Sequence, residues 1–130
     1  VSVFGSSSII GSIQYNKHNK KTTYYKMARE QTGLSLADSI KKNIDYGCGE
    51  ILLTEISNDG TYKGLDLNII DDIQKFANTP FLIGGGFGKV DEIINFNNFV
   101  SAIVISSSLH YSKVKISDLI KKRNLVNLNN

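Results

Sequence analysis

The chain has 130 residues, of which 41% are apolar, so it can bury one core of ordinary size and is predicted to be a single compact unit. Its net charge of +3 is too small to indicate a nucleic-acid or anionic-membrane partner, and no apolar run approaches the roughly 18 residues that a membrane span needs. The single cysteine, Cys48, excludes an intramolecular disulfide framework, and the whole composition fits a cytoplasmic protein.

Four short apolar runs are predicted to be buried parallel strands, because they do not alternate with polar residues. They are SIIGSIQ at Ser8–Gln14, EILLTE at Glu50–Glu55, PFLIG at Pro80–Gly84 and AIVIS at Ala102–Ser106. Each is followed by a segment with helical spacing, and these segments cover Leu34–Ile44, Leu67–Phe76, Val90–Ile94 and Ile116–Ile120. The resulting βαβαβαβα order predicts an α/β fold with a parallel sheet, either doubly wound or part of a barrel.

The length favours the barrel. A four-stranded parallel sheet leaves edges and an apolar face exposed, whereas eight strands in about 250 residues close a (β/α)8 TIM barrel. We therefore expect residues 1–130 to form half of a barrel, as a fragment of a longer chain, since the sequence begins at Val1 without a methionine. Self-association of an isolated half-barrel is a non-enzymatic alternative.

A basic segment, Tyr15–Thr32, separates the first strand from the first helix. It contains five Lys and Arg residues against a single acid, Glu30, and we expect a mobile hairpin with Thr22–Tyr25 as its β-prone arm. A loop after a barrel strand lies on the catalytic face, where a basic one could cover an anionic substrate. A solvated loop without a contact role is an equally good interpretation.

Two segments that follow strands are typical of phosphate sites. The glycines of Gly84–Gly88 allow backbone N–H groups to approach an anion and lead into a helix start near Lys89–Val90, and Ser106–Ser108 add hydroxyl donors at another helix start. Barrel phosphate sites commonly follow strands seven and eight, which numbers the four strands five to eight. The spacing fits neither a dinucleotide fingerprint nor a P-loop, and the remaining alternative is a tight turn without a ligand.

Other reactive side chains give weaker signals. The Asp59-Gly60-Thr61 run is an ordinary turn sequence that gains interest from its position after a strand. His18 and His110 have no second ligand at metal spacing, and Cys48 lacks a basic partner nearby. We therefore expect no metal and no cofactor.

Taken together, GEILLTEISNDGTYKGLDLNII (Gly49–Ile70), FLIGGGFGK (Phe81–Lys89), SSSLHY (Ser106–Tyr111) and the opening VFGSSSII resemble one family. It is the family of cyclase subunits of imidazole glycerol phosphate synthase, and the resemblance covers the C-terminal half of that barrel. It implies a lyase/cyclase of histidine biosynthesis that takes ammonia from a separate glutaminase subunit and acts on a bis-phosphorylated ribulosyl substrate. Its own N-terminal half-barrel would complete the fold, with no nucleic-acid or membrane partner.

The resemblance also assigns site residues. The anchors for one phosphate are Asp59, Gly60, Gly85, Gly86, Ser106 and Ser107. Thr54 lines the centre, and Gln14 stands where the family has a catalytic aspartate, so these two are the candidate catalytic positions. Glutamine cannot exchange a proton as a carboxyl does, so this acid–base step is in question. A divergent paralogue that delivers ammonia for sugar amidation in polysaccharide biosynthesis is the alternative function.

Overall fold

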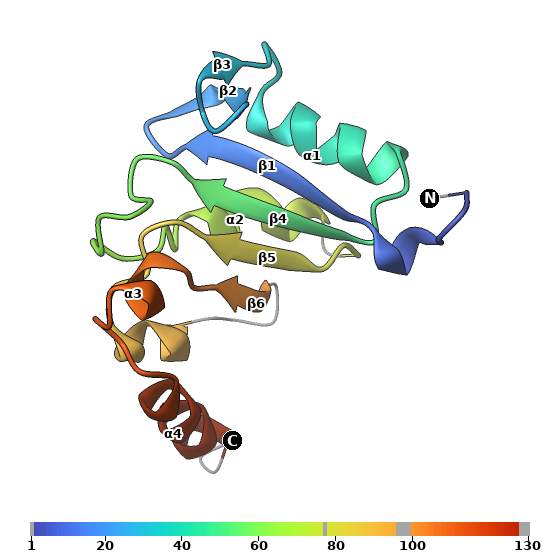
Figure 1. Cartoon of the computed structure of the whole chain (residues 1–130). Coiled ribbons are helices and arrows are strands. Elements are labelled where there is room, and N and C mark those ends of the chain that lie inside the picture. Colours follow the sequence, from blue (N-terminus) through green and yellow to red (C-terminus); the bar gives the residue numbers. More distant parts are fainter. Residues whose placement is uncertain (1, 77, 96–99, 128–130) are drawn as a thin grey trace.

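The computed structural model describes residues 2–76, 78–95 and 100–127 (Figure 1). The strands are β1 (Ile10–Asn16), β2 (Asn19–Tyr25), β3 (Glu30–Gln31), β4 (Glu50–Glu55), β5 (Phe81–Gly84) and β6 (Val100–Val104). The α-helices are α1 (Leu36–Asp45), α2 (Ile69–Ile73), α3 (Ser107–His110) and α4 (Ile116–Asn127). Three 3₁₀ helices are η1 (Ser6–Ser8), η2 (Gln74–Phe76) and η3 (Val90–Asn95).

The strands form one six-stranded sheet in the order β3-β2-β1-β4-β5-β6. β1, β4, β5 and β6 run parallel and alternate with helices, which confirms the predicted α/β architecture. β1 begins later and β6 ends earlier than predicted, because a short helical turn lies at that end of each strand. Ser6–Ser8 form η1, closed by a bond from Ile9 N–H to Ser6 O, and Ser106 is the residue just before α3 instead of the end of β6.

The basic segment Tyr15–Thr32 forms the predicted hairpin, but as part of the sheet. β2 pairs antiparallel with β1, Gln14 lying opposite Tyr24, and β3 pairs with β2 in turn. Because its backbone hydrogen bonds are satisfied in this way, most of the segment extends the sheet at the β1 edge rather than lying loose above it.

The side chains on the two faces of the sheet differ in how deeply they are buried. Alternate residues such as Ile13, Leu53 and Ile83 are buried in a core that also contains Ile40 of α1 and Ile73 of α2. The opposite face carries a row in register across the four parallel strands, and we call this face the open face. Its members are exposed or half-buried: Ser12, Leu52, Leu82 and Ala102.

The helices follow from local signals. Ser35 caps α1 by accepting a 3.1 Å hydrogen bond from the N–H of Asp38. α2 begins at Ile69, later than predicted, because the preceding loop is tied at Asp66, which accepts a 3.1 Å hydrogen bond from the Tyr15 hydroxyl. In the described part of the chain no helix combines the length and hydropathy that a membrane crossing requires.

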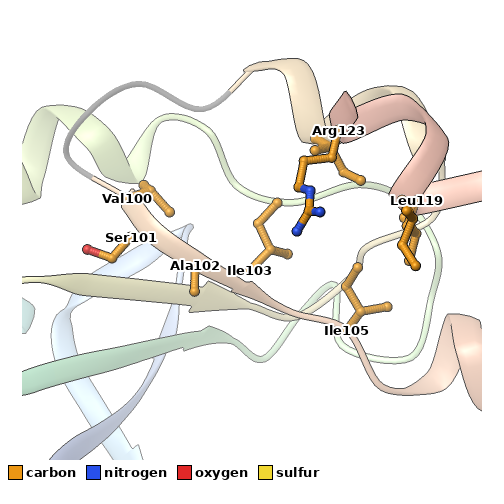
Figure 2. Close-up of a pocket in the computed structure, with 9 residues that line it drawn as sticks. Val100, Ser101, Ala102, Ile103, Ile105, Leu119 and Arg123 are labelled. Carbon is orange, nitrogen blue, oxygen red and sulfur yellow. The ribbon is translucent and has the colours of Figure 1, made fainter. Parts of the chain in front are cut away.

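An apolar groove of about 370 Å³ lies between β6 and α4. Figure 2 shows Leu119 and Arg123 of α4 extending toward Ile103 and Ile105. Its lining is almost entirely aliphatic, and it lies beside the outermost parallel strand rather than at the ends of several strands. We therefore interpret it as incomplete core packing beside the edge strand β6, and the candidate site lies elsewhere.

Candidate functional site

The carboxyl ends of the parallel strands bring one row of residues together on the open face. Gln14 of β1 pairs in register with Thr54 of β4, Thr54 with Gly84 of β5, and Gly84 with Val104 of β6. Side chains in register on parallel neighbours point to the same side of a sheet, so this row forms a floor at the ends of the strands.

A cavity of about 160 Å³ opens above this floor, between the loops that follow β4, β5 and β6. We call it the glycine–serine cavity. It is lined by Thr54, Asp59, Gly84, Gly85, Gly86, Phe87, Val104, Ser106, Ser107 and Ser108. Six of the eight residues predicted to form a site therefore surround one space: Thr54, Asp59, Gly85, Gly86, Ser106 and Ser107.

The glycine turn packs tightly against the loop after β4. Gly85 and Gly86 have φ angles of +94° and +96°, which side-chain-bearing residues rarely adopt. A Cβ atom on Gly86 would lie 2.6 Å from both the Asn58 Cβ and the Gly64 backbone oxygen, and one on Gly85 would collide with the backbone of Glu55. Backbone packing alone thus requires both glycines, whether or not a ligand binds.

Several backbone donors around the cavity have no acceptor among the described residues. Among the residues that the structure describes, no protein acceptor takes the N–H groups of Gly85, Gly86 or Ser107. Ser106 also makes no side-chain cap to α3. Since buried or half-buried N–H groups are seldom left without a partner, an acceptor in the cavity would complete them.

The helix start after the glycine turn differs from the prediction. The N–H groups of Gly88 and Lys89 donate to Oε1 of Glu92 at 3.1 and 2.9 Å, and Leu65 N–H donates to its other oxygen at 3.0 Å. The segment is also a 3₁₀ helix of six residues. An internal carboxylate therefore occupies the anion position near Lys89–Val90, and the free donors lie earlier, at Gly85 and Gly86.

Ser108 joins the two walls of the cavity. It is 1% exposed, and its hydroxyl donates to the backbone oxygen of Phe87 in the glycine turn. Ser106 is exposed and Ser107 half-buried, so their hydroxyls can reach the cavity. The three serines thus divide into one that fixes the structure and two that are available to a ligand.

Glu55 is a structural residue that the sequence reasoning missed. It is fully buried, and its carboxylate accepts hydrogen bonds from the N–H groups of Lys17, Ser57 and Asn58 and from the Ser57 hydroxyl. Burial by itself raises the pKa of Glu55, but these donors outweigh it and hold the pKa below its ordinary value. The ionised carboxylate thereby fixes the loop that carries Asp59. The sequence signal that could have identified Glu55 is its position shortly before Ser57-Asn58, because both residue types are common in turns.

Two predicted residues lie outside the cavity lining. Gly60 sits at an exposed turn with a φ of +73° and open space around it. Gln14 shares the floor with Thr54, but its Oε1 accepts a 2.8 Å hydrogen bond from Ala28 N–H in the turn after β2. The roles predicted for Gly60 and Gln14 therefore stay predictions, and the side-chain oxygen of Gln14 is already bonded within the chain.

The basic segment is largely paired within the protein. Lys17 Nζ donates to Asn58 Oδ1 at 2.9 Å, Lys20 pairs with Asp72 at 2.5 Å and Lys26 with Glu30 at 2.7 Å. Lys17, His18 and Lys20 line a separate polar cavity of about 440 Å³ beside the loop before α2. In the described ranges no three His, Cys, Asp or Glu side chains gather as a metal site would require.

The amino-acid sequence of the chain is similar to that of known proteins. Residues 1–115 match the family described as histidine biosynthesis protein. The chain belongs to that family. Its parallel β/α units are accordingly half of a (β/α)8 TIM barrel, as the sequence predicted.

Three similar proteins are each named imidazole glycerol phosphate synthase subunit HisF. The protein of Lactococcus lactis is 36% identical over 89% of this chain and 47% of its own length. That of Bacillus cereus strain Q1 is 35% identical over 97% and 51%, and one from Prochlorococcus marinus is 34% identical over 89% and 48%. The chain spans about half the length of these curated relatives, and the resemblance to the synthase family is confirmed.

Proposed function

We propose that residues 1–130 are strands five to eight of a barrel that binds a sugar phosphate and works as a lyase/cyclase of the imidazole glycerol phosphate synthase type. One observation carries the proposal. The glycine–serine cavity brings the N–H groups of Gly85, Gly86 and Ser107, which have no acceptor among the described residues, beside the hydroxyls of Ser106 and Ser107 at the ends of adjacent parallel strands.

Such a cavity suits a phosphate group. A phosphate monoester offers several acceptor oxygens, and backbone N–H and hydroxyl donors from two loops can meet it from different sides. The carboxylate of Asp59 cannot donate to phosphate, so at the cavity rim it suits a hydroxyl of the attached sugar, with Gly60 next to it on the exposed turn. Thr54, on the floor between Gln14 and Gly84, lies where the sugar would extend from the phosphate.

The reaction and the partners of the whole protein are proposed from its relatives. The substrate would be the bis-phosphorylated ribulosyl compound of the synthase or a similar sugar phosphate, and a glutaminase subunit would supply the ammonia. Gln14 cannot act as the acid or base at the end of β1, so this chain would contribute phosphate binding and substrate placement. The relatives named above lend no support to the sugar-amidation alternative, which stays a prediction.

The other half of the barrel would supply the missing neighbours. Among the described residues, β6 is the last strand of the sheet order, and the open face carries Leu52 and Leu82 without a covering layer. An N-terminal half-barrel would pair with the edge of β6 and bury these side chains.

The test supplies ammonium and the ribulosyl substrate to the full-length protein and follows formation of imidazole glycerol phosphate. We expect the unmodified protein to turn over the substrate. Ser107→Ala should lower kcat/KM about fivefold, and Ser101→Ala should leave it unchanged. Ser101 is a matched control, because it is exposed on β6 and lies outside the cavity. No turnover together with no stabilisation by inorganic phosphate would exclude both the activity and the phosphate site.

A further inference from the structure

Gln14 stands within reach of a ligand that starts in the glycine–serine cavity. Neighbouring strands lie about 4.8 Å apart, and Gln14 is separated from Gly84 only by Thr54 in the same row. It therefore lies roughly 10 Å across the floor from the glycine turn, about the length of a pentose phosphate.

The orientation of the Gln14 amide is decided by its contact. The 2.8 Å partner of the side chain is the backbone N–H of Ala28, which can only donate, so the atom facing it must be the oxygen. The Nε2 group is thereby the other end of the amide. Among the side-chain hydrogen bonds of the described residues, Gln14 takes part only through its Oε1, so its Nε2 has no protein acceptor there.

The oxygen of Gln14 is committed to holding an unfavourable turn. Lys26, Met27 and Ala28 have φ angles of 50°, 58° and 62°, a run of left-handed residues without glycine. Ala28 N–H is bonded to Gln14, and Lys26 is paired with Glu30 across the base of the turn. Breaking the Gln14 contact would release a strained segment, so the amide cannot rotate freely to exchange its two ends.

We propose that Gln14 determines ligand specificity as a fixed hydrogen-bond donor, its Nε2 meeting an oxygen of a sugar phosphate whose phosphate lies in the glycine–serine cavity. This inference rests on the phosphate site proposed above. An amide with its oxygen occupied can only donate, so the ligand presents an acceptor at this point, a carbonyl, ether or hydroxyl oxygen. The turn at Ala28 is the positioning element, because it decides which end of the amide faces the ligand.

Two substitutions separate donation from positioning. Gln14→Glu keeps an oxygen for the Ala28 N–H but removes the donor, whereas Gln14→Met removes both. Gln31→Met, on the exposed strand β3, is the matched control. Dissociation constants of the full-length protein are measured for ribose 5-phosphate and for inorganic phosphate, and their ratio cancels any general effect of charge on the anion site. Trypsin cleavage after Lys26 and Arg29 reports the turn.

Both Gln14 variants are expected to lose about fivefold of the preference for ribose 5-phosphate over phosphate, while only Gln14→Met becomes more sensitive to trypsin. A preference retained in Gln14→Glu and lost in Gln14→Met would assign it to the turn, and a preference unchanged in both would leave Gln14 without a ligand role. Either result overturns the proposal. Failure of the unmodified protein to bind inorganic phosphate would instead overturn the phosphate site itself.

Discussion

The buried carboxylate of Glu55 accepts a 2.6 Å hydrogen bond from the backbone N–H of Asn58. Asn58 in turn donates through its Nδ2 to Gly64 O at 2.8 Å and packs where a Cβ of Gly86 would lie. The end of β4 and the glycine turn after β5 are therefore joined through these two residues, and the stability of the candidate site depends on them.

Replacing Glu55 with glutamine should destabilise the protein by roughly 2–3 kcal/mol, because one amide NH2 would then face donors in place of an acceptor. Urea unfolding measures this change. Glu50→Gln is the control, since Glu50 begins the same strand and is half-buried. Equal stability of the two variants would contradict the structural role of Glu55.

The same carboxylate predicts a pH dependence. Its pKa in the folded protein lies below its ordinary value of 4.5, so its contribution to stability is present above that pH and is lost as the pH falls through the folded value. The free energy of unfolding should therefore fall on acidification below about pH 4.5, and less steeply in Glu55→Gln. Parallel curves for the two proteins would show that Glu55 does not titrate as predicted.

Gly86 and Gly60 offer a matched pair for the glycine turn. Both have left-handed φ angles, +96° and +73°, but only Gly86 lacks room for a Cβ. Gly60→Ala should cost about 1 kcal/mol from backbone conformation, and Gly86→Ala about 2–4 kcal/mol because overpacking is added. Thermal and urea unfolding compare the variants, and similar losses would mean that the turn is not packed as described.

Tyr15 should ionise only at strongly alkaline pH. Burial, the charge of Asp66 and the 3.1 Å hydrogen bond to its carboxylate all raise the pKa of the Tyr15 hydroxyl. Ultraviolet difference titration should lose its last, highest-pH step in Tyr15→Phe, and that variant should be about 1–2 kcal/mol less stable because Asp66 loses its partner. Tyr24→Phe, on the adjacent strand β2, should retain the last step.

The order of elements could be predicted because apolar runs and helical spacing are local properties of the sequence. The ends of β1 and β6 could not, since short helical turns at Ser6–Ser8 and Ser107–His110 compete for the flanking residues. Nor does local spacing reveal that the chain before α2 is held by a contact between Tyr15 and Asp66, which are 51 residues apart.

For the site, glycines and serines after strands identified the cavity because their conformational freedom and small side chains are visible in the sequence. The partners of polar groups were not visible. Glu92 takes the helix-start N–H groups and Gln14 holds Ala28, and both contacts depend on how loops fold back. Charged and amide side chains have several possible partners, and only the fold selects one.

Residues 1–130 produced alone should self-associate. Leu52 and Leu82 lie side by side on the open face, and in the part of the chain that the structure describes β6 has no strand paired with its outer edge. A second copy of the chain would bury the two leucines and pair with the edge of β6, so sedimentation at tens of micromolar should give a mass of a dimer or more.

Leu82→Lys should yield folded monomer, because a charge in that face opposes burial. Ile116→Lys, which adds the same charge at a residue 61% exposed on α4, should leave association unchanged. A monomer at this concentration with native circular dichroism would mean that the open face is stable in water.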